Sequence, residues 1–169
     1  VASHIRSLGA NCKLISVVGN DKTANFVRKE LNERGIANGL VTDNSRPTTF
    51  KKRYVVENQK LFRVTRLEDH NLDSETENKL IAQLKDSAKH ANGIVISDFV
   101  YGVITEKVIK VIYELAEKYN LMLFGDVQCS SQIGEITKFK MFSLLCPNER
   151  EARIALHDKD SGLEILSQK

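Results

Sequence analysis

The chain has 169 residues, of which 41% are hydrophobic and 28% are charged, and its formal net charge is +3. This composition is typical of a soluble globular domain with its own core. The small charge, with basic and acidic residues interleaved, does not favour a nucleic-acid partner. No apolar run approaches membrane-spanning length, and the first residues show no signal-peptide pattern. We therefore expect a cytoplasmic protein with neither a membrane nor a nucleic-acid partner.

The three cysteines are Cys12, Cys129 and Cys146, and they form no CxxC pair. Cys12 and Cys146 fall in apolar runs that we expect to be buried strands, where cysteine behaves as a small hydrophobic residue. The four histidines have no partner at metal-ligand spacing. The sequence therefore favours neither a disulfide framework nor a zinc site, and it suits a reducing compartment.

The first part of the chain alternates helical and β-rich patterns. Apolar spacing predicts a helix over 1–8, a strand over 12–18, a helix over 22–34 and a short strand over 39–42. Gly9 and Gly35 suit the ends of the two helices. In the second helix we expect Phe26, Val27 and Leu31 to face the core.

A β-hairpin pattern interrupts this alternation within about residues 46–67. Residues 48–57 and 61–66 are two alternating runs joined by a turn over 57–60. Its basic residues are Lys51, Lys52, Arg53, Arg63 and Arg66. They either protect an exposed edge strand or bind an anion, and the sequence leaves both readings open.

The second part of the chain returns to alternating helices and strands. The pattern Ser74 to Glu77 predicts a capping box at the start of a helix. The inward residues of that helix are expected to be Leu80, Ile81, Leu84 and Ala88. Strands are predicted over 93–98, 121–126 and 142–146, and helices from Thr105, over 148–156 and over 162–168. Residues 127–138 remain unassigned, because Gly134 would break a long helix.

Polar side chains end three of the apolar runs, at Asp98, Asp126 and Asn148. Each alone could simply suit a turn. Together they predict a polar crevice at the carboxyl ends of parallel strands, where open α/β sheets bind ligands. The unbroken run 94–96 predicts a strand buried on both faces. The series therefore predicts an α/β fold with a mostly parallel sheet and flanking helices.

Several familiar catalytic and cofactor motifs are absent from the sequence. No Gly-x-Gly-x-x-Gly fingerprint, Walker sequence or Gly-x-Ser-x-Gly elbow occurs. An NAD-binding domain is therefore disfavoured. The candidate chemistry rests on the polar strand ends and on the basic hairpin.

The chain resembles the PfkB, or ribokinase-like, carbohydrate kinases over nearly its whole length. The resemblance is carried, in the family's order, by residues 7–11, 14–21, 47–53, 58–63, 96–102, 125–128 and 146–152. It is closest to the heptose 7-phosphate kinase branch, which acts in lipopolysaccharide-precursor synthesis. It implies a ribokinase-like fold with the hairpin as a β-lid, and an activity that uses ATP and Mg²⁺ to phosphorylate a sugar hydroxyl. It also implies a homodimer formed through the lid.

The resemblance further implies roles for two residues near the end of the chain. Asn148 and Glu151 match the family's Asn-x-x-Glu, which helps to organise Mg²⁺ and the ATP phosphates. Glu151 would act on the metal through water. The same spacing at a helix start is also a capping box, and both functions are compatible.

Substrate contacts are implied for four other residues. Asp98 and Asp126 would lie at the sugar or phosphate side of the crevice. Arg53 and Arg63 would extend from the lid towards an anionic substrate.

The chain also departs from the family pattern. Tyr101 and Gln128 stand where heptose kinases usually have lysine, so the resemblance leaves open whether the sugar already carries a phosphate. The family's first strand and its Asp-Thr-x-Gly-Ala-Gly-Asp sequence, which supplies the anion hole and catalytic base, are not found. We therefore expect residues 1–169 to be a partial kinase domain without catalytic residues, inactive alone. The alternative is a non-catalytic α/β module that binds sugar or nucleotide, or regulates.

Overall fold

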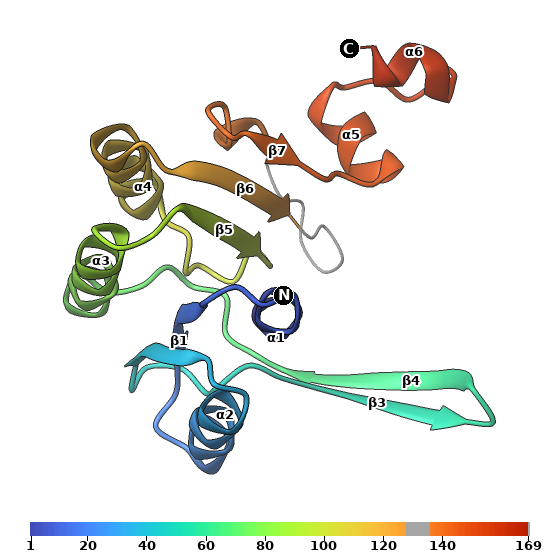
Figure 1. Ribbon diagram of the computed structural model, residues 1–169. Helices are drawn as coiled ribbons and strands as arrows, with labels where there is room; N and C mark the ends of the chain where they lie inside the picture. The colour runs from blue at the N-terminus through green and yellow to red at the C-terminus, as the bar shows by residue number, and fades with distance from the viewer. Residues whose placement is uncertain (128–135, 169) are drawn as a thin grey trace. The chain divides into compact units, whose positions relative to one another are not determined.

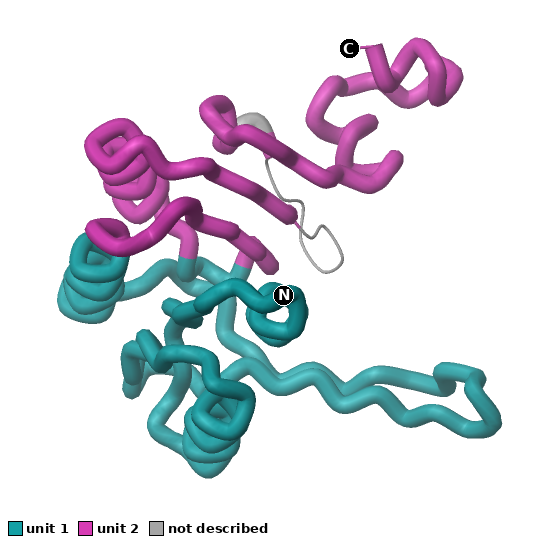
Figure 2. The backbone as a smooth tube through the Cα atoms, viewed as in Figure 1, with its two compact units in different colours: residues 1–87, 101–103 teal, residues 88–100, 104–169 magenta. Residues whose placement is uncertain are grey.

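The computed structural model describes residues 1–127 and 136–168 of the chain (Figure 1). They belong to two compact units (Figure 2). Unit 1 contains Val1–Ser87 and Tyr101–Val103, and unit 2 contains Ala88–Val100 and Ile104–Lys169. Both units contain helices and parallel strands, and the predicted α/β class is confirmed.

Unit 1 begins with a short helix that is followed by a βαβ arrangement. Its elements are α1 (Ala2–Ser7), β1 (Lys13–Val18), α2 (Lys22–Glu33) and β2 (Ala37–Thr42). The two strands are parallel, and their register runs from Lys13 opposite Ala37 to Val18 opposite Thr42. The intervening α2 is therefore the crossover helix that a parallel pair requires.

The buried side of α2 differs from the predicted one. Ala24 and Leu31 are buried, and Val27 is half-buried between them, which is the i, i+3, i+7 stripe of an amphipathic helix. Phe26 is 61% exposed, so its predicted place in the core is wrong. The reason is angular, because Phe26 lies one residue, or about 100°, away from Val27 around the helix.

The predicted hairpin is confirmed as β3 (Phe50–Val56) and β4 (Gln59–Arg66), which pair antiparallel. The turn is tighter than expected. Glu57 and Asn58 alone connect the strands, and both take left-handed φ angles, of 46° and 70°. Two successive positive φ angles are typical of the type I′ turn, whose twist matches that of the strands. In Figure 1 the hairpin is a long ribbon that projects from the rest of unit 1.

The helix α3 (Ser74–Ala88) buries the four residues predicted to face inward, Leu80, Ile81, Leu84 and Ala88. Its cap differs from the prediction. The Asp73 carboxylate accepts the backbone N–H of Thr76 at 2.8 Å and its hydroxyl at 3.1 Å. The helix is therefore capped one residue earlier than the predicted Ser74, because a carboxylate offers two acceptor oxygens where serine offers one.

Unit 2 contains a three-stranded parallel sheet in the order β5–β6–β7. Its elements are β5 (Gly93–Asp98), α4 (Glu106–Tyr119), β6 (Met122–Val127), the 3₁₀ turn η1 (Ile136–Lys138), β7 (Leu144–Leu145), α5 (Glu149–Ala155) and α6 (Leu163–Ser167). Thr105 caps α4 as predicted, because its hydroxyl accepts the N–H of Val108. The last strand is shorter than the predicted run 142–146.

One face of this sheet is buried and the other is exposed. Ile96, Leu123 and Val127 share the buried face by register and alternation. On the opposite face, Val95, Met122 and Leu144 are 46%, 54% and 53% exposed. The prediction that the run 94–96 is buried on both faces is therefore wrong. A strand buries both faces only where layers cover both sides, and within the described residues one side of β5 is left open.

Two of the cysteines lie beside strands instead of within them. Cys12 precedes β1 and is partly exposed, while Cys146 follows β7 and is exposed, and both are free thiols. Their prediction as buried strand residues is wrong, because each apolar run extends past the paired segment. Cys129, Gln128 and Gly134 lie outside the described residues. None of the described helices has both the length and the apolar character needed to span a membrane.

Candidate functional site

Asp98 and Asp126 lie at the carboxyl ends of neighbouring parallel strands, as the sequence predicted. Asp98 is the last residue of β5, and Asp126 is next to last in β6. The register sets Asp126 opposite Ser97, and Asp98 opposite Val127. Because side chains alternate along a strand, the two carboxylates share an edge but lie on opposite faces of the sheet. Asp98 is 3% exposed, whereas Asp126 is half-buried.

Asp98 is held by two donors. Its Oδ1 accepts the backbone N–H of Val100 at 2.8 Å, and its Oδ2 accepts the ammonium group of Lys138 at 2.5 Å. A carboxylate this buried needs such compensation, because burial removes its hydration. The sequence did not identify Lys138, which lies at the end of the unassigned segment and 40 positions from its partner.

The backbone that follows Asp98 is strained. Val100 has a φ of 61°, in the left-handed region that a β-branched residue rarely adopts. Such conformations cost of order 1–3 kcal/mol and cluster at ligand-binding sites and active sites. The hydrogen bond from Val100 N–H to Asp98 is one contact that holds this turn.

Asn148 and Glu151 form the capping box that the sequence allowed. The Asn148 side chain accepts the N–H of Glu151 at 3.0 Å, and the Glu151 carboxylate accepts the N–H of Asn148 at 2.9 Å. Glu151 is 7% exposed. Within residues 1–127 and 136–168, no group of three His, Cys, Asp or Glu side chains is placed to hold a metal ion. The capping box itself occupies the Oε2 atom of the Glu151 carboxylate.

The hairpin has a cationic face. Arg53 lies directly opposite Arg63, and Lys51 directly opposite Thr65. Lys51 places its ammonium 4.9 Å from the ring centroid of Tyr101, which belongs to the same unit. Like charges directly opposite each other destabilise a strand pair. Both arginines are exposed, so an anion bound between them would relieve the repulsion.

The other, apolar face of the hairpin also carries Lys52 and Arg66. Phe50, Tyr54, Phe62 and Val64 alternate onto it and are 44%, 37%, 53% and 49% exposed. The rings of Tyr54 and Phe62 stack with centroids 4.4 Å apart. Lys52 extends its ammonium over the Tyr54 ring at 4.8 Å. The hairpin therefore has Arg53 and Arg63 on one face, and aromatic surface beside Lys52 and Arg66 on the other.

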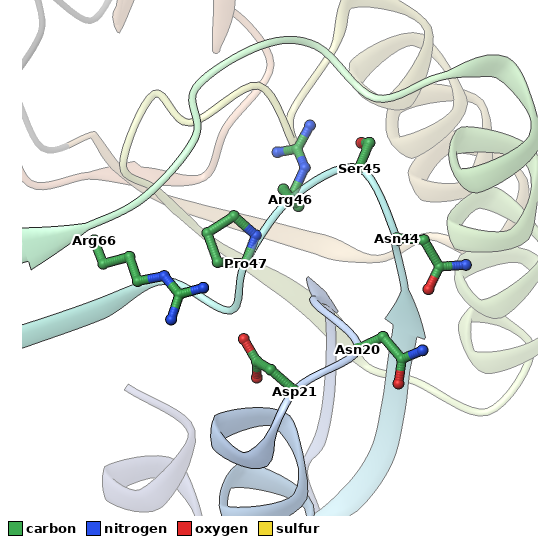
Figure 3. Close-up of a pocket in the computed structure, with 7 residues that line it drawn as sticks. All are labelled: Asn20, Asp21, Asn44, Ser45, Arg46, Pro47 and Arg66. Atoms are coloured by element: carbon green, nitrogen blue, oxygen red, sulfur yellow. The ribbon is translucent and has the colours of Figure 1, made fainter.

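A polar pocket of about 280 Å³ opens at the carboxyl ends of β1 and β2 (Figure 3). It is lined by Asn20, Asp21, Asn44, Ser45, Arg46, Pro47 and Arg66. The Asp21 carboxylate accepts the N–H of Ala24 at 2.9 Å, and the N–H and hydroxyl of Thr48 at 3.0 and 2.8 Å. These hydrogen bonds lower the pKa of Asp21. The sequence did not predict this pocket, although both strands end in polar residues.

Arg46 connects the pocket to the interior of unit 1. Its guanidinium donates to the Asp43 carboxylate at 2.8 Å, to the Tyr101 carbonyl at 2.9 Å and to the His70 carbonyl at 2.7 Å. Burial raises the pKa of Asp43, but hydrogen bonds from Ser45 and the Arg46 charge outweigh it and hold that pKa below its usual value. This network fixes the entry to the hairpin.

Comparison of the sequence with known proteins identifies one matching family and several related proteins. The family described as pfkB family carbohydrate kinase matches residues 1–168. The bifunctional protein HldE of Helicobacter acinonychis (strain Sheeba) is 32% identical over 164 residues, covering 96% of this chain and 34% of that protein. HldE of Campylobacter jejuni subsp. jejuni serotype O:6 is 32% identical over 157 residues, covering 92% and 32%. The chain thus spans about a third of the length of these relatives.

Solved structures share the fold. A phosphofructokinase-2 mutant from Escherichia coli matches with a TM-score of 0.75 at 14% identity, covering 99% of this chain and 53% of that one. Ribokinase from Giardia lamblia matches with a TM-score of 0.64 at 20% identity, covering 83% and 45%. The predicted ribokinase-like fold is confirmed. Together with the family match along the sequence, this places the chain in the pfkB family of carbohydrate kinases.

Proposed function

We propose that this chain is part of an ATP-dependent kinase that phosphorylates a hydroxyl group of a sugar phosphate, with a heptose phosphate as the first substrate to test. The observation that supports an anionic substrate is that Arg53 and Arg63 lie directly opposite each other on the hairpin. The bifunctional HldE relatives support the choice of a heptose. In this proposal the two guanidinium groups bind the phosphate already present on the sugar.

The remaining candidate residues take roles that suit their surroundings. Asp126, half-buried at the strand edge, accepts a hydrogen bond from a sugar hydroxyl. Asp98 contributes to the substrate side of the site through its ion pair with Lys138. Asn148 and Glu151 orient hydrated Mg²⁺ near the nucleotide phosphates through the start of α5. When bound, ATP supplies the phosphoryl group and Mg²⁺ neutralises part of its charge. The chain's own contribution is positioning, which phosphoryl transfer mainly requires.

We also propose that residues 1–169 form only part of the kinase domain. In this view the catalytic base lies outside them, and the isolated chain does not turn over ATP. This proposal is supported by the 34% coverage of the first HldE relative and about half coverage of the solved kinases. ADP release by the isolated chain and by the complete protein that contains it, each with Mg-ATP and heptose 7-phosphate, tests it. Turnover by the isolated chain would contradict the partial-domain proposal.

The substrate proposal is tested with arginine variants of the complete protein. We expect Arg53→Gln or Arg63→Gln to raise the KM for heptose 7-phosphate about tenfold, because each removes a charged hydrogen-bond donor. The KM for the unphosphorylated heptose should stay within about twofold. Lys60→Gln, at an exposed position on the same strand as Arg63, is the matched control. An equal loss for both sugars would contradict a phosphate contact. Sugar binding without turnover in the complete wild-type protein would favour the non-catalytic module.

The apolar face of the hairpin supports a further proposal, that the protein is a homodimer assembled through the hairpins of two copies. A two-stranded hairpin is marginally stable alone. Pairing the face formed by Phe50, Tyr54, Phe62 and Val64 with its copy would remove those side chains from water.

A further inference from the structure

Lys138 is held both at its ammonium group and at its backbone, although its side chain is 27% exposed. Its ammonium donates to Asp98 Oδ2 at 2.5 Å, and its backbone carbonyl accepts the Tyr113 hydroxyl at 2.5 Å. The ammonium also lies 5.2 Å from the ring centroid of Phe139, which is 2% exposed. A flexible lysine side chain loses considerable rotamer entropy when it becomes ordered. Because Lys138 is already ordered, ligand binding would not carry this entropic cost.

The two members of this ion pair differ in access. The Asp98 side chain is 4% exposed, so its carboxylate is covered. The Lys138 ammonium has three donors, and one of them serves Asp98. The pair sits at the carboxyl end of β5, the edge at which open α/β sheets bind ligands. The accessible member is therefore the hydrogen-bond donor.

The charge balance of the pair selects the class of ligand. An anion that approached Lys138 would also approach the Asp98 carboxylate at close range, and this like-charge contact would offset the attraction. A hydroxyl oxygen accepts from the ammonium without that repulsion. The ion pair is therefore better suited to a polyol than to a phosphate, in contrast to the cationic hairpin face.

We propose that Lys138 is a specificity-determining residue that donates a hydrogen bond to a hydroxyl oxygen of the sugar, with Asp98 as the residue that positions it. This inference rests on the proposed function and assigns a residue of that site that the sequence did not reveal. A purely structural salt bridge would predict a loss of stability without a selective loss of sugar affinity.

The test uses the complete protein and its Lys138→Met and Lys138→Arg variants. Lys138→Met removes the donor while keeping the length of the side chain. We expect it to raise the KM for the sugar about tenfold, the size expected for losing a hydrogen bond to a charged group, with the KM for ATP within about twofold. Lys138→Arg should restore much of the affinity. Lys140→Met, exposed two residues away, is the control. An unchanged sugar KM in Lys138→Met would overturn the inference.

A binding measurement separates this inference from the proposed function. Calorimetric titration of the wild type and the same variants with D-mannose, D-fructose, D-ribose and heptose 7-phosphate needs no turnover. If the wild type binds one of these sugars but does not phosphorylate it, the kinase proposal fails and the Lys138→Met affinity still decides the inference. Binding that is unchanged in Lys138→Met, or absent for every sugar in the wild type, overturns the inference. Melting temperatures of the variants show whether the fold is retained.

Discussion

Gly102 occupies a position that other residues cannot take. Its φ is 72°, and a Cβ there would collide with the backbone carbonyl of His70. We expect Gly102→Ala to lower the free energy of unfolding by more than about 3 kcal/mol, since a left-handed residue costs 1–2 kcal/mol before any clash. Gly9 is the matched control, because its φ is 91° but nothing lies within 4 Å of its Cβ position. Gly9→Ala should cost about 1 kcal/mol by urea denaturation.

The lowered pKa values of Asp21 and Asp43 should make the free energy of unfolding depend on pH in the acidic range. The pKa of each is lower in the folded chain than in the unfolded chain. The unfolded state therefore binds more protons, and stability falls as pH drops from about 4 through the folded pKa values. We expect the urea midpoint to decrease as pH falls through this window. Asp21→Asn should make the decrease shallower, and a stability that rises on acidification would contradict the assignment.

The buried and exposed faces of the unit 2 sheet should differ in how much a truncated side chain destabilises the fold. Leu123 and Leu144 lie on neighbouring strands but on opposite faces, with Leu123 2% exposed and Leu144 53% exposed. We expect Leu123→Ala to cost about 2–5 kcal/mol, because it leaves a cavity. Leu144→Ala should cost less than about 1 kcal/mol, because water already reaches that side chain. Similar losses for both variants, measured by chemical denaturation of the chain, would show that the exposed face is covered in solution.

Much of the element structure could be predicted from the sequence, because it depends on local patterns. The Thr105 cap, the buried residues of α3 and the hairpin follow from spacing and turn chemistry. The exposure of Val95 could not be predicted, since a run of three apolar residues does not reveal which faces a second layer covers. Within the candidate site, strand ends identified Asp98. Its partner Lys138 is distant in sequence, and no periodic pattern links the two.

The apolar face of the hairpin predicts that the protein is a dimer. We expect sedimentation velocity to show a dimer of the wild-type chain, and Tyr54→Lys with Phe62→Lys to shift it to a monomer, since buried charges oppose association. Phe26→Lys is the control, because Phe26 is more exposed than either residue, at 61%, but lies on α2. A wild-type monomer at high concentration, or dissociation by the control, would contradict assembly through the hairpin.

The two faces of the hairpin have a kinetic consequence. A strand pair that holds Arg53 against Arg63 on one side and exposes aromatic rings on the other is costly to keep ordered in isolation. If a second copy orders the aromatic side, it also sets the arginines in place for the proposed phosphate contact. Specific activity would then fall on dilution below the dissociation constant of the dimer, and saturating sugar phosphate would oppose that fall by mass action. The proposed kinase activity would thus depend on protein concentration as well as on substrate concentration.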